Sequence, residues 1–94
     1  MKRLVLSDND LTELPDAFEH LTVLDNLQLE DNSLTHLPAT IGQAQNLKII
    51  YLENNKLTTV PTEVGNLINL KIIHLNNNPL RKVDPIVKTN LRRI

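Results

Sequence analysis

A 23-residue repeat runs through the chain and constrains its fold more than any other feature. Counting positions from residues 1, 24, 47 and 70, the same residue types recur at fixed places in all four repeats. Two of these columns are Leu6, Leu29, Leu52 and Leu75, and Asn9, Asn32, Asn55 and Asn78. Since a unit this short cannot bury its own apolar face, neighbouring units must stack. The sequence therefore predicts a solenoid, in which each repeat packs against the next.

Within a repeat, the apolar residues have two different spacings. Leu27 and Leu29 alternate with Asn26 and Gln28, which is the period of a half-buried β-strand. One strand per repeat predicts a parallel sheet along one side of the solenoid. Later apolar residues of each repeat, such as Leu34 and Ile41 in the second one, return along the other side and face the same core. A proline at a fixed place (Pro15, Pro38 and Pro61) is expected to open a short helical turn or an extended stretch there.

The full pattern, L-x-x-L-x-L-x-x-N-x-L-x-x-L-P, is clearest over residues 24–38. It resembles the leucine-rich repeat family, and the 23-residue period with Leu-Pro is similar to the intracellular Ras-suppressor type. The resemblance implies an α/β solenoid, a right-handed superhelix of about four repeats with a parallel β-sheet on its concave face and short helical or irregular segments on its convex side. It covers nearly the whole chain, so we expect one domain, residues 1–94, with repeats at about 1–23, 24–46, 47–69 and 70–94.

The two ends of the repeat array differ. Asp84 and Pro85 are good N-cap and first-turn residues, and they predict a capping helix from about residue 85. No such cap precedes the first repeat, whose strand around Arg3 would be an unpaired edge. We therefore expect residues 1–14 either to pair with a second copy of the chain or to fray.

The recurring asparagine stands where the chain turns away from each strand. Its side-chain amide offers two donors and an acceptor, enough to satisfy backbone groups that a buried bend would leave unpaired. We predict a structural Asn ladder formed by Asn9, Asn32, Asn55 and Asn78.

The resemblance implies that the concave sheet face contacts a protein partner, and the strand period predicts which side chains reach it. The candidate binding residues are Asn26, Gln28, Glu30, Ile49, Tyr51, Glu53, Ile72, His74 and Asn76. Among them Ile49, Tyr51, Ile72 and His74 would form an apolar and aromatic cluster suited to a binding hot spot. The alternative is that Ile and Tyr stand there because they favour strands.

An acidic ridge is predicted beside this cluster, formed by Asp8, Glu30, Asp31 and Glu53. Such a ridge could pair with a basic patch on a partner protein. The alternative is an ordinary solvated rim that contributes little to binding.

Other classes of function find little support. The chain has a net charge of −1, one Phe, one Tyr, no Trp and no Cys, which disfavours nucleic-acid or membrane binding and disulfides. The segment Asp8-Asn9-Asp10 lacks the glycine of a calcium loop, and the three histidines fall at different repeat positions, so no metal site is expected. We expect no cofactor and no enzymatic activity, and the absence of cysteine favours a cytoplasmic location.

Three hypotheses about function remain open at this stage. In the first, the chain is a protein-interaction module that uses its concave face. In the second, it is a recognition or targeting segment of a larger signalling protein or enzyme. In the third, it is a structural unit that self-assembles through its ends.

Overall fold

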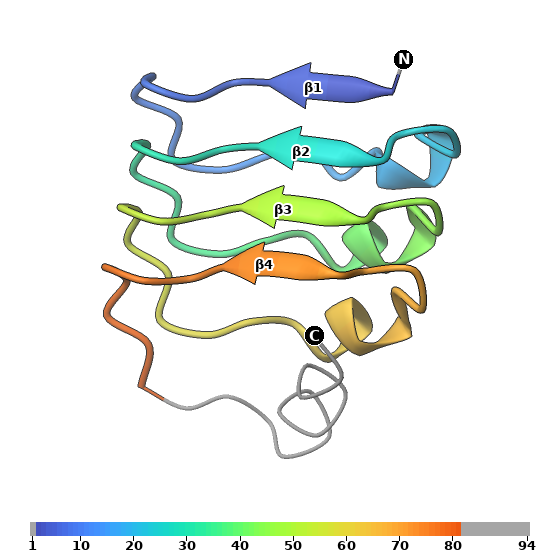
Figure 1. The fold of residues 1–94 in the computed structure, drawn as a ribbon. Coiled ribbons are helices and arrows are strands. Elements are labelled where there is room, and N and C mark those ends of the chain that lie inside the picture. The colour runs from blue at the N-terminus through green and yellow to red at the C-terminus, as the bar shows by residue number, and fades with distance from the viewer. Residues whose placement is uncertain (1, 82–94) are drawn as a thin grey trace.

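The computed structural model describes residues 2–81, which form a single layer of parallel β-strands backed by short 3-10 helices (Figure 1). The strands are β1 (Arg3–Val5), β2 (Asn26–Gln28), β3 (Ile49–Tyr51) and β4 (Ile72–His74). They lie in the order β1-β2-β3-β4, and partners across each pair are 23 residues apart, as in Arg3 with Asn26 and Ile49 with Ile72. The predicted parallel sheet of a repeat solenoid is confirmed. The predicted capping helix from about residue 85 lies outside the described residues.

In residues 2–81, the side opposite the sheet has three 3-10 helices. They are η1 (Phe18–His20), η2 (Ala39–Gln43) and η3 (Thr62–Asn66). Pro38 and Pro61 precede η2 and η3 as N-cap residues with extended backbone, so both prolines mark the start of a helical turn. At Gly42 a Cβ atom would lie 2.6 Å from the carbonyl oxygen of Glu63, and the missing side chain therefore lets η2 and η3 stack closely.

The core lies between the sheet and the 3-10 helices and consists mainly of leucine. Leu27, Leu29, Leu34 and Leu52 are completely buried, as are Ile41 and Val64 from the helical side. The matching residues of the first repeat, Leu4, Leu6 and Leu11, are only partly buried against this cluster. Burial of one repeat therefore depends on a neighbour on each side, as expected for a stacked array.

The turns after β2, β3 and β4 are each joined to the preceding repeat by the Asn ladder. The Asn55 side-chain amide donates to the carbonyl oxygens of Leu52 (3.0 Å) and, one repeat back, Leu29 (3.0 Å). Its Oδ1 atom accepts the backbone N–H of Leu34 at 3.0 Å. Asn32 and Asn78 make the equivalent bonds to their own and the preceding repeats. Each ladder residue from the second repeat onward therefore ties two repeats together.

Asn9 has a different environment from the other ladder residues. Its amide donates to the carbonyl oxygens of Leu6 and Ser7 within its own turn, and its side chain is exposed, whereas Asn32 and Asn55 are buried. The same residue thus forms a local turn in the first repeat and a link between repeats further along.

Candidate functional site

The outward side chains of strands β1 to β4 form an open surface, called here the sheet face. It consists of Arg3, Val5, Asn26, Gln28, Ile49, Tyr51, Ile72 and His74. In β2 and β3 the central residue is buried and the two flanking residues are partly exposed, so strand alternation sends them outward as predicted. The nine predicted binding residues lie on this face or just beyond the ends of its strands.

The centre of the sheet face is apolar. Ile49 pairs in register with Ile72, and Tyr51 pairs with His74, so β3 and β4 bring all four side chains of the predicted cluster together. The Tyr51 and His74 rings are tilted by 59° with their centroids 5.0 Å apart. Ile72 is 38% exposed and Val5, on the same face of β1, is 49% exposed. The cluster is therefore a packed apolar surface that remains accessible.

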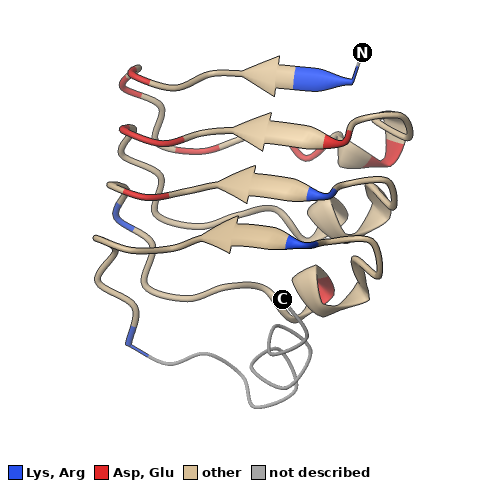
Figure 2. Ribbon diagram, viewed as in Figure 1, with Lys and Arg blue, Asp and Glu red and all other residues tan. Residues whose placement is uncertain are grey.

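Carboxylates gather at the end of the sheet face where the strands finish (Figure 2). Glu30 and Glu53 both stand two residues beyond their strands, in neighbouring repeats. Glu53 Oε2 lies 3.2 Å from His74 Nδ1, which links this acidic end to the apolar centre. The Oε1 atoms of Glu30 and Glu53 are buried and have no hydrogen-bond partner among the described residues. Two carboxylates in neighbouring repeats thus give this end of the face a local negative charge.

Position eight of each repeat follows the strand and has a distinct backbone conformation. Asp8, Asp31, Asn54 and Asn77 all have left-handed backbone, with φ between 58° and 61°. Asn and Asp tolerate this conformation better than other non-glycine residues, so backbone geometry already accounts for their identity. Asn54 donates to Asp31 at 2.7 Å and Asn77 donates to Asn54 at 2.8 Å, which forms a second row of side-chain bonds along the turns.

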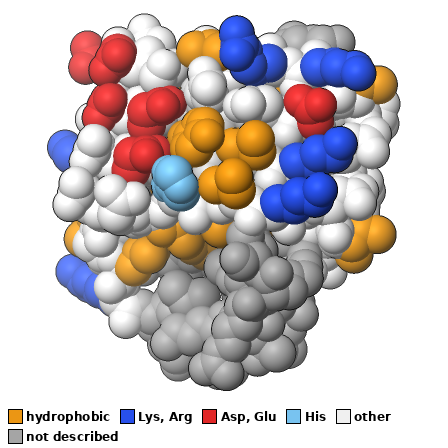
Figure 3. All heavy atoms as spheres, viewed as in Figure 1, with side chains coloured by type: hydrophobic (Ala, Val, Ile, Leu, Met, Phe, Trp, Pro, Cys, Tyr) orange, Lys and Arg blue, Asp and Glu red, His pale blue; other side chains and the backbone are white. Residues whose placement is uncertain are grey.

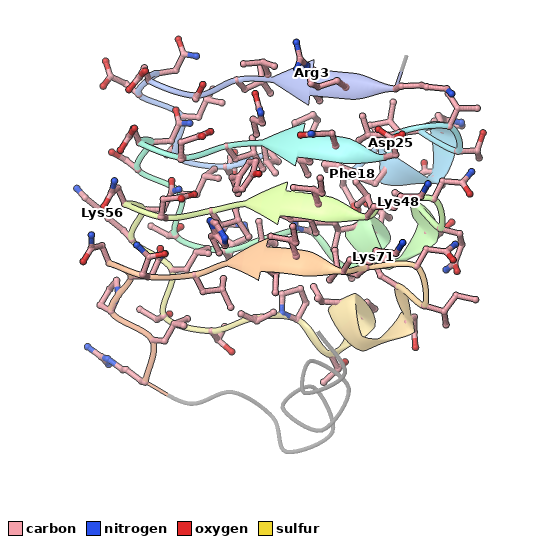
Figure 4. All side chains as sticks on the ribbon, viewed as in Figure 1. Arg3, Phe18, Asp25, Lys48, Lys56 and Lys71 are labelled. Atoms are coloured by element: carbon pink, nitrogen blue, oxygen red, sulfur yellow. The ribbon has the colours of Figure 1, made fainter. Side chains whose placement is uncertain are left out.

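Basic side chains gather at the opposite end of the sheet face, where the strands begin, and sequence reasoning missed them. Figure 3 shows them across the apolar centre from the acidic group, and Figure 4 shows where Arg3, Lys48 and Lys71 lie. The backbone holds them in a row, because the N–H of Lys71 donates to the carbonyl oxygen of Lys48 at 2.8 Å. The signal was present in the sequence, where position two reads Lys2, Asp25, Lys48 and Lys71.

The basic end contains a shallow hollow between neighbouring repeats. It has a volume of about 240 Å³ and is lined by Lys2, Val23, Asp25, Asn46 and Lys48. Among the described residues no ion pair engages Lys2, Lys48 or Lys71. The ammonium groups of Lys2 and Lys48 therefore outnumber the one carboxylate, Asp25, that lines this hollow.

Other kinds of site are not evident in the part of the chain that the structure describes. Within residues 2–81 no group of three or more His, Asp or Glu side chains is placed to hold a metal ion. The same residues include no helix that is both long and apolar enough to cross a bilayer.

Comparison with known proteins agrees with the architecture. Two family models, both described as leucine-rich repeats, match residues 22–80 and residues 1–21. No curated protein sequence matched the chain significantly. Among solved structures, a leucine-rich repeat protein of Leptospira interrogans superimposes with a TM-score of 0.85 at 39% sequence identity. The match covers 99% of this chain and 23% of the Leptospira chain, so the chain spans about a quarter of that protein's length. From its repeats, its sheet and these matches, the chain belongs to the leucine-rich repeat family.

Proposed function

We propose that this chain is a protein-interaction module that binds its partner through the sheet face, with Tyr51 and Ile72 at the centre of the contact. Leucine-rich repeat domains are generally protein-interaction modules. The observation that carries the proposal is the cluster of Ile49, Tyr51, Ile72 and His74, which is apolar, packed and accessible. Partly exposed aromatic and aliphatic side chains of this kind make effective anchors once a partner excludes water from them.

The size of the sheet face limits the strength of such binding. Four strands at about 4.8 Å spacing give a surface only about 15 Å wide. A standard interface buries about 800 Å² per partner, more than this face alone is expected to offer. The described repeats should therefore bind weakly, or bind together with flanking segments.

The alternative that the chain acts as the recognition segment of a larger signalling protein or enzyme is supported by one comparison. The chain matches 23% of the length of the Leptospira protein. Under this alternative the sheet face still binds a protein, and any chemistry belongs to another part of the molecule. The Ras-suppressor subtype, the cytoplasmic location and self-association through residues 1–14 stay predictions.

Affinity capture with matched variants tests the proposal. The bait would be the wild-type chain, the double variant Tyr51→Ala with Ile72→Ala, or the control Ile68→Ala. Ile68 is 74% exposed and lies outside the strands, so its loss removes a similar apolar side chain from another surface. We expect a set of proteins that the wild type and the control retain and the double variant loses. Equal recovery of the same proteins by all three baits would contradict the proposal.

A further inference from the structure

The charges of the sheet face are separated along the direction of the strands. Lys2, Arg3, Lys48 and Lys71 stand where the strands begin, together with one carboxylate, Asp25, while Glu30 and Glu53 stand beyond the strand ends (Figures 2 and 3). The end where the strands begin therefore has a net positive charge. The apolar cluster occupies the space between the two groups. From position two to position seven there are five residues, which is about 16 Å of extended chain. A partner that lies along the strands would therefore meet opposite charges at its two ends.

Each end of the face has charged side chains that a partner of opposite charge could pair with. At the acidic end, Glu30 and Glu53 have no Lys or Arg partner among the described residues. The basic end has the hollow of about 240 Å³ beside Lys2 and Lys48. An arginine or lysine suits the first end, and a carboxylate suits the second, because charge-assisted hydrogen bonds are the stronger ones.

The middle of the face also favours one backbone conformation in the partner. Gln28, on β2, has a side-chain amide that is partly exposed on this face. An extended segment presents backbone N–H groups that such an amide oxygen can accept. A helix uses most of its backbone N–H groups internally, and it would need about eleven residues to span the same 16 Å.

We infer that the sheet face binds an extended, dipolar peptide segment, with an acidic side chain at one end, apolar side chains in the middle and a basic side chain at the other. Its acidic end lies over Lys48 and the neighbouring hollow, and its basic end lies over Glu30 and Glu53. The opposite charges are about five residues apart. This inference rests on the proposed function, since it names the chemistry of the partner for the same face.

Three synthetic peptides with the same apolar centre test the charge arrangement. One is acidic at one end and basic at the other, one is acidic at both ends, and one is basic at both ends. Titration calorimetry at low ionic strength would measure their dissociation constants for the wild-type chain. We expect the dipolar peptide to bind about tenfold more tightly than either of the others, because each of those meets like charge at one end.

Charge-reversal variants make the test reciprocal. With Lys48→Glu and Lys71→Glu the formerly basic end has three carboxylates, including Asp25, against Lys2 and Arg3. Its net charge becomes negative, and the doubly basic peptide should then bind best. With Glu30→Lys and Glu53→Lys the doubly acidic peptide should be preferred. The variant with all four changes should recover the preference for the dipolar peptide, which can bind in the opposite direction. Where a charge reversal impairs folding, two milder double variants replace it, Lys48→Gln with Lys71→Gln and Glu30→Gln with Glu53→Gln. Each should remove the preference for the dipolar peptide.

The outcomes separate this inference from the proposed function. Three results would overturn the inference that the face binds a dipolar segment. They are equal binding of the three peptides, binding of none of them, and no recovery of the preference in the variant with all four changes. If partner capture still depends on Tyr51 and Ile72 in that case, the sheet face remains the binding surface for a partner of different chemistry. If capture is also independent of those residues, both proposals fail.

Discussion

The two faces of the sheet differ in residue choice, although they alternate along the same three-residue strands. Facing inward, Leu27 and Ile50 are completely buried, and every repeat has leucine or isoleucine at this position. Facing outward, the residues one place later are Val5, Gln28, Tyr51 and His74, which share no chemistry. Each inward side chain packs between near-identical neighbours, so its size and polarity are fixed by stacking. The outward side chains lack that constraint, and under the proposed function they are where specificity for a partner can differ from repeat to repeat.

The largest expected effect separates two adjacent isoleucines. Ile50 is completely buried and Ile49 is partly exposed on the sheet face. Ile50→Ala should lower the free energy of unfolding by about 2–5 kcal/mol, because it leaves a cavity between stacked repeats. Urea denaturation would measure the effect. Ile49→Ala is the matched control and should cost about 1 kcal/mol or less. Equal losses for the two variants would mean that inward and outward positions are not energetically distinct.

A second comparison uses the adjacent asparagines of the third turn. Asn55 is buried and connects two repeats, whereas Asn54 is exposed and has left-handed backbone. Asn55→Ala should cost about 1–3 kcal/mol, because the buried N–H of Leu34 loses its acceptor. Asn54→Ala should cost about 1 kcal/mol through backbone strain, and Asn54→Gly should remove most of that strain. If thermal melts show Asn55→Ala to be harmless, the Asn ladder does not stabilise the stack.

The smallest expected effect on stability lies at the acidic end of the sheet face. Glu30→Gln with Glu53→Gln should change the free energy of unfolding by no more than about 0.5 kcal/mol, since neither side chain is part of the core. The same variant should associate more slowly with a basic partner segment and respond less to added salt. Stopped-flow association at two ionic strengths measures both properties. Wild-type rates that do not change with salt would remove the acidic end from the binding process.

Most of the fold could be predicted because stacking imposes one period on every element. The 23-residue spacing of Leu6, Leu29 and Leu52 gave both the positions of the strands and their register, since partners across the sheet are the same distance apart. The helical side was predicted less sharply. The proline before each helix is compatible with a helical turn or with an extended stretch, so the sequence left both open. In the structure the segment after Pro38 is a 3-10 helix, and it packs against the neighbouring repeat at Gly42.

The candidate site was predicted in part. Alternation along β3 and β4 was enough to bring Tyr51 and His74 together. The left-handed turn column was missed, although Asp or Asn at position eight of every repeat was a usable signal. The basic end was missed because Lys48 and Lys71 precede the strands, so strand alternation alone says nothing about where they lie. The charge pattern expected of a partner follows from the acidic and basic ends of the sheet face taken together. Their relative placement is known only from the three-dimensional structure.

The most direct test of the account measures unfolding and binding together on one inward and one outward substitution. The inward change is Ile50→Val and the outward change is Tyr51→Ala, with the free energy of unfolding and the dissociation constant for a captured partner measured for each. We predict that Ile50→Val lowers stability by about 0.5–1.5 kcal/mol and leaves binding unchanged. Tyr51→Ala should weaken binding at least about tenfold while stability changes by less than about 1 kcal/mol. The opposite assignment, or a parallel loss of stability and binding in both variants, would contradict the division between an inward face that folds the chain and an outward face that binds.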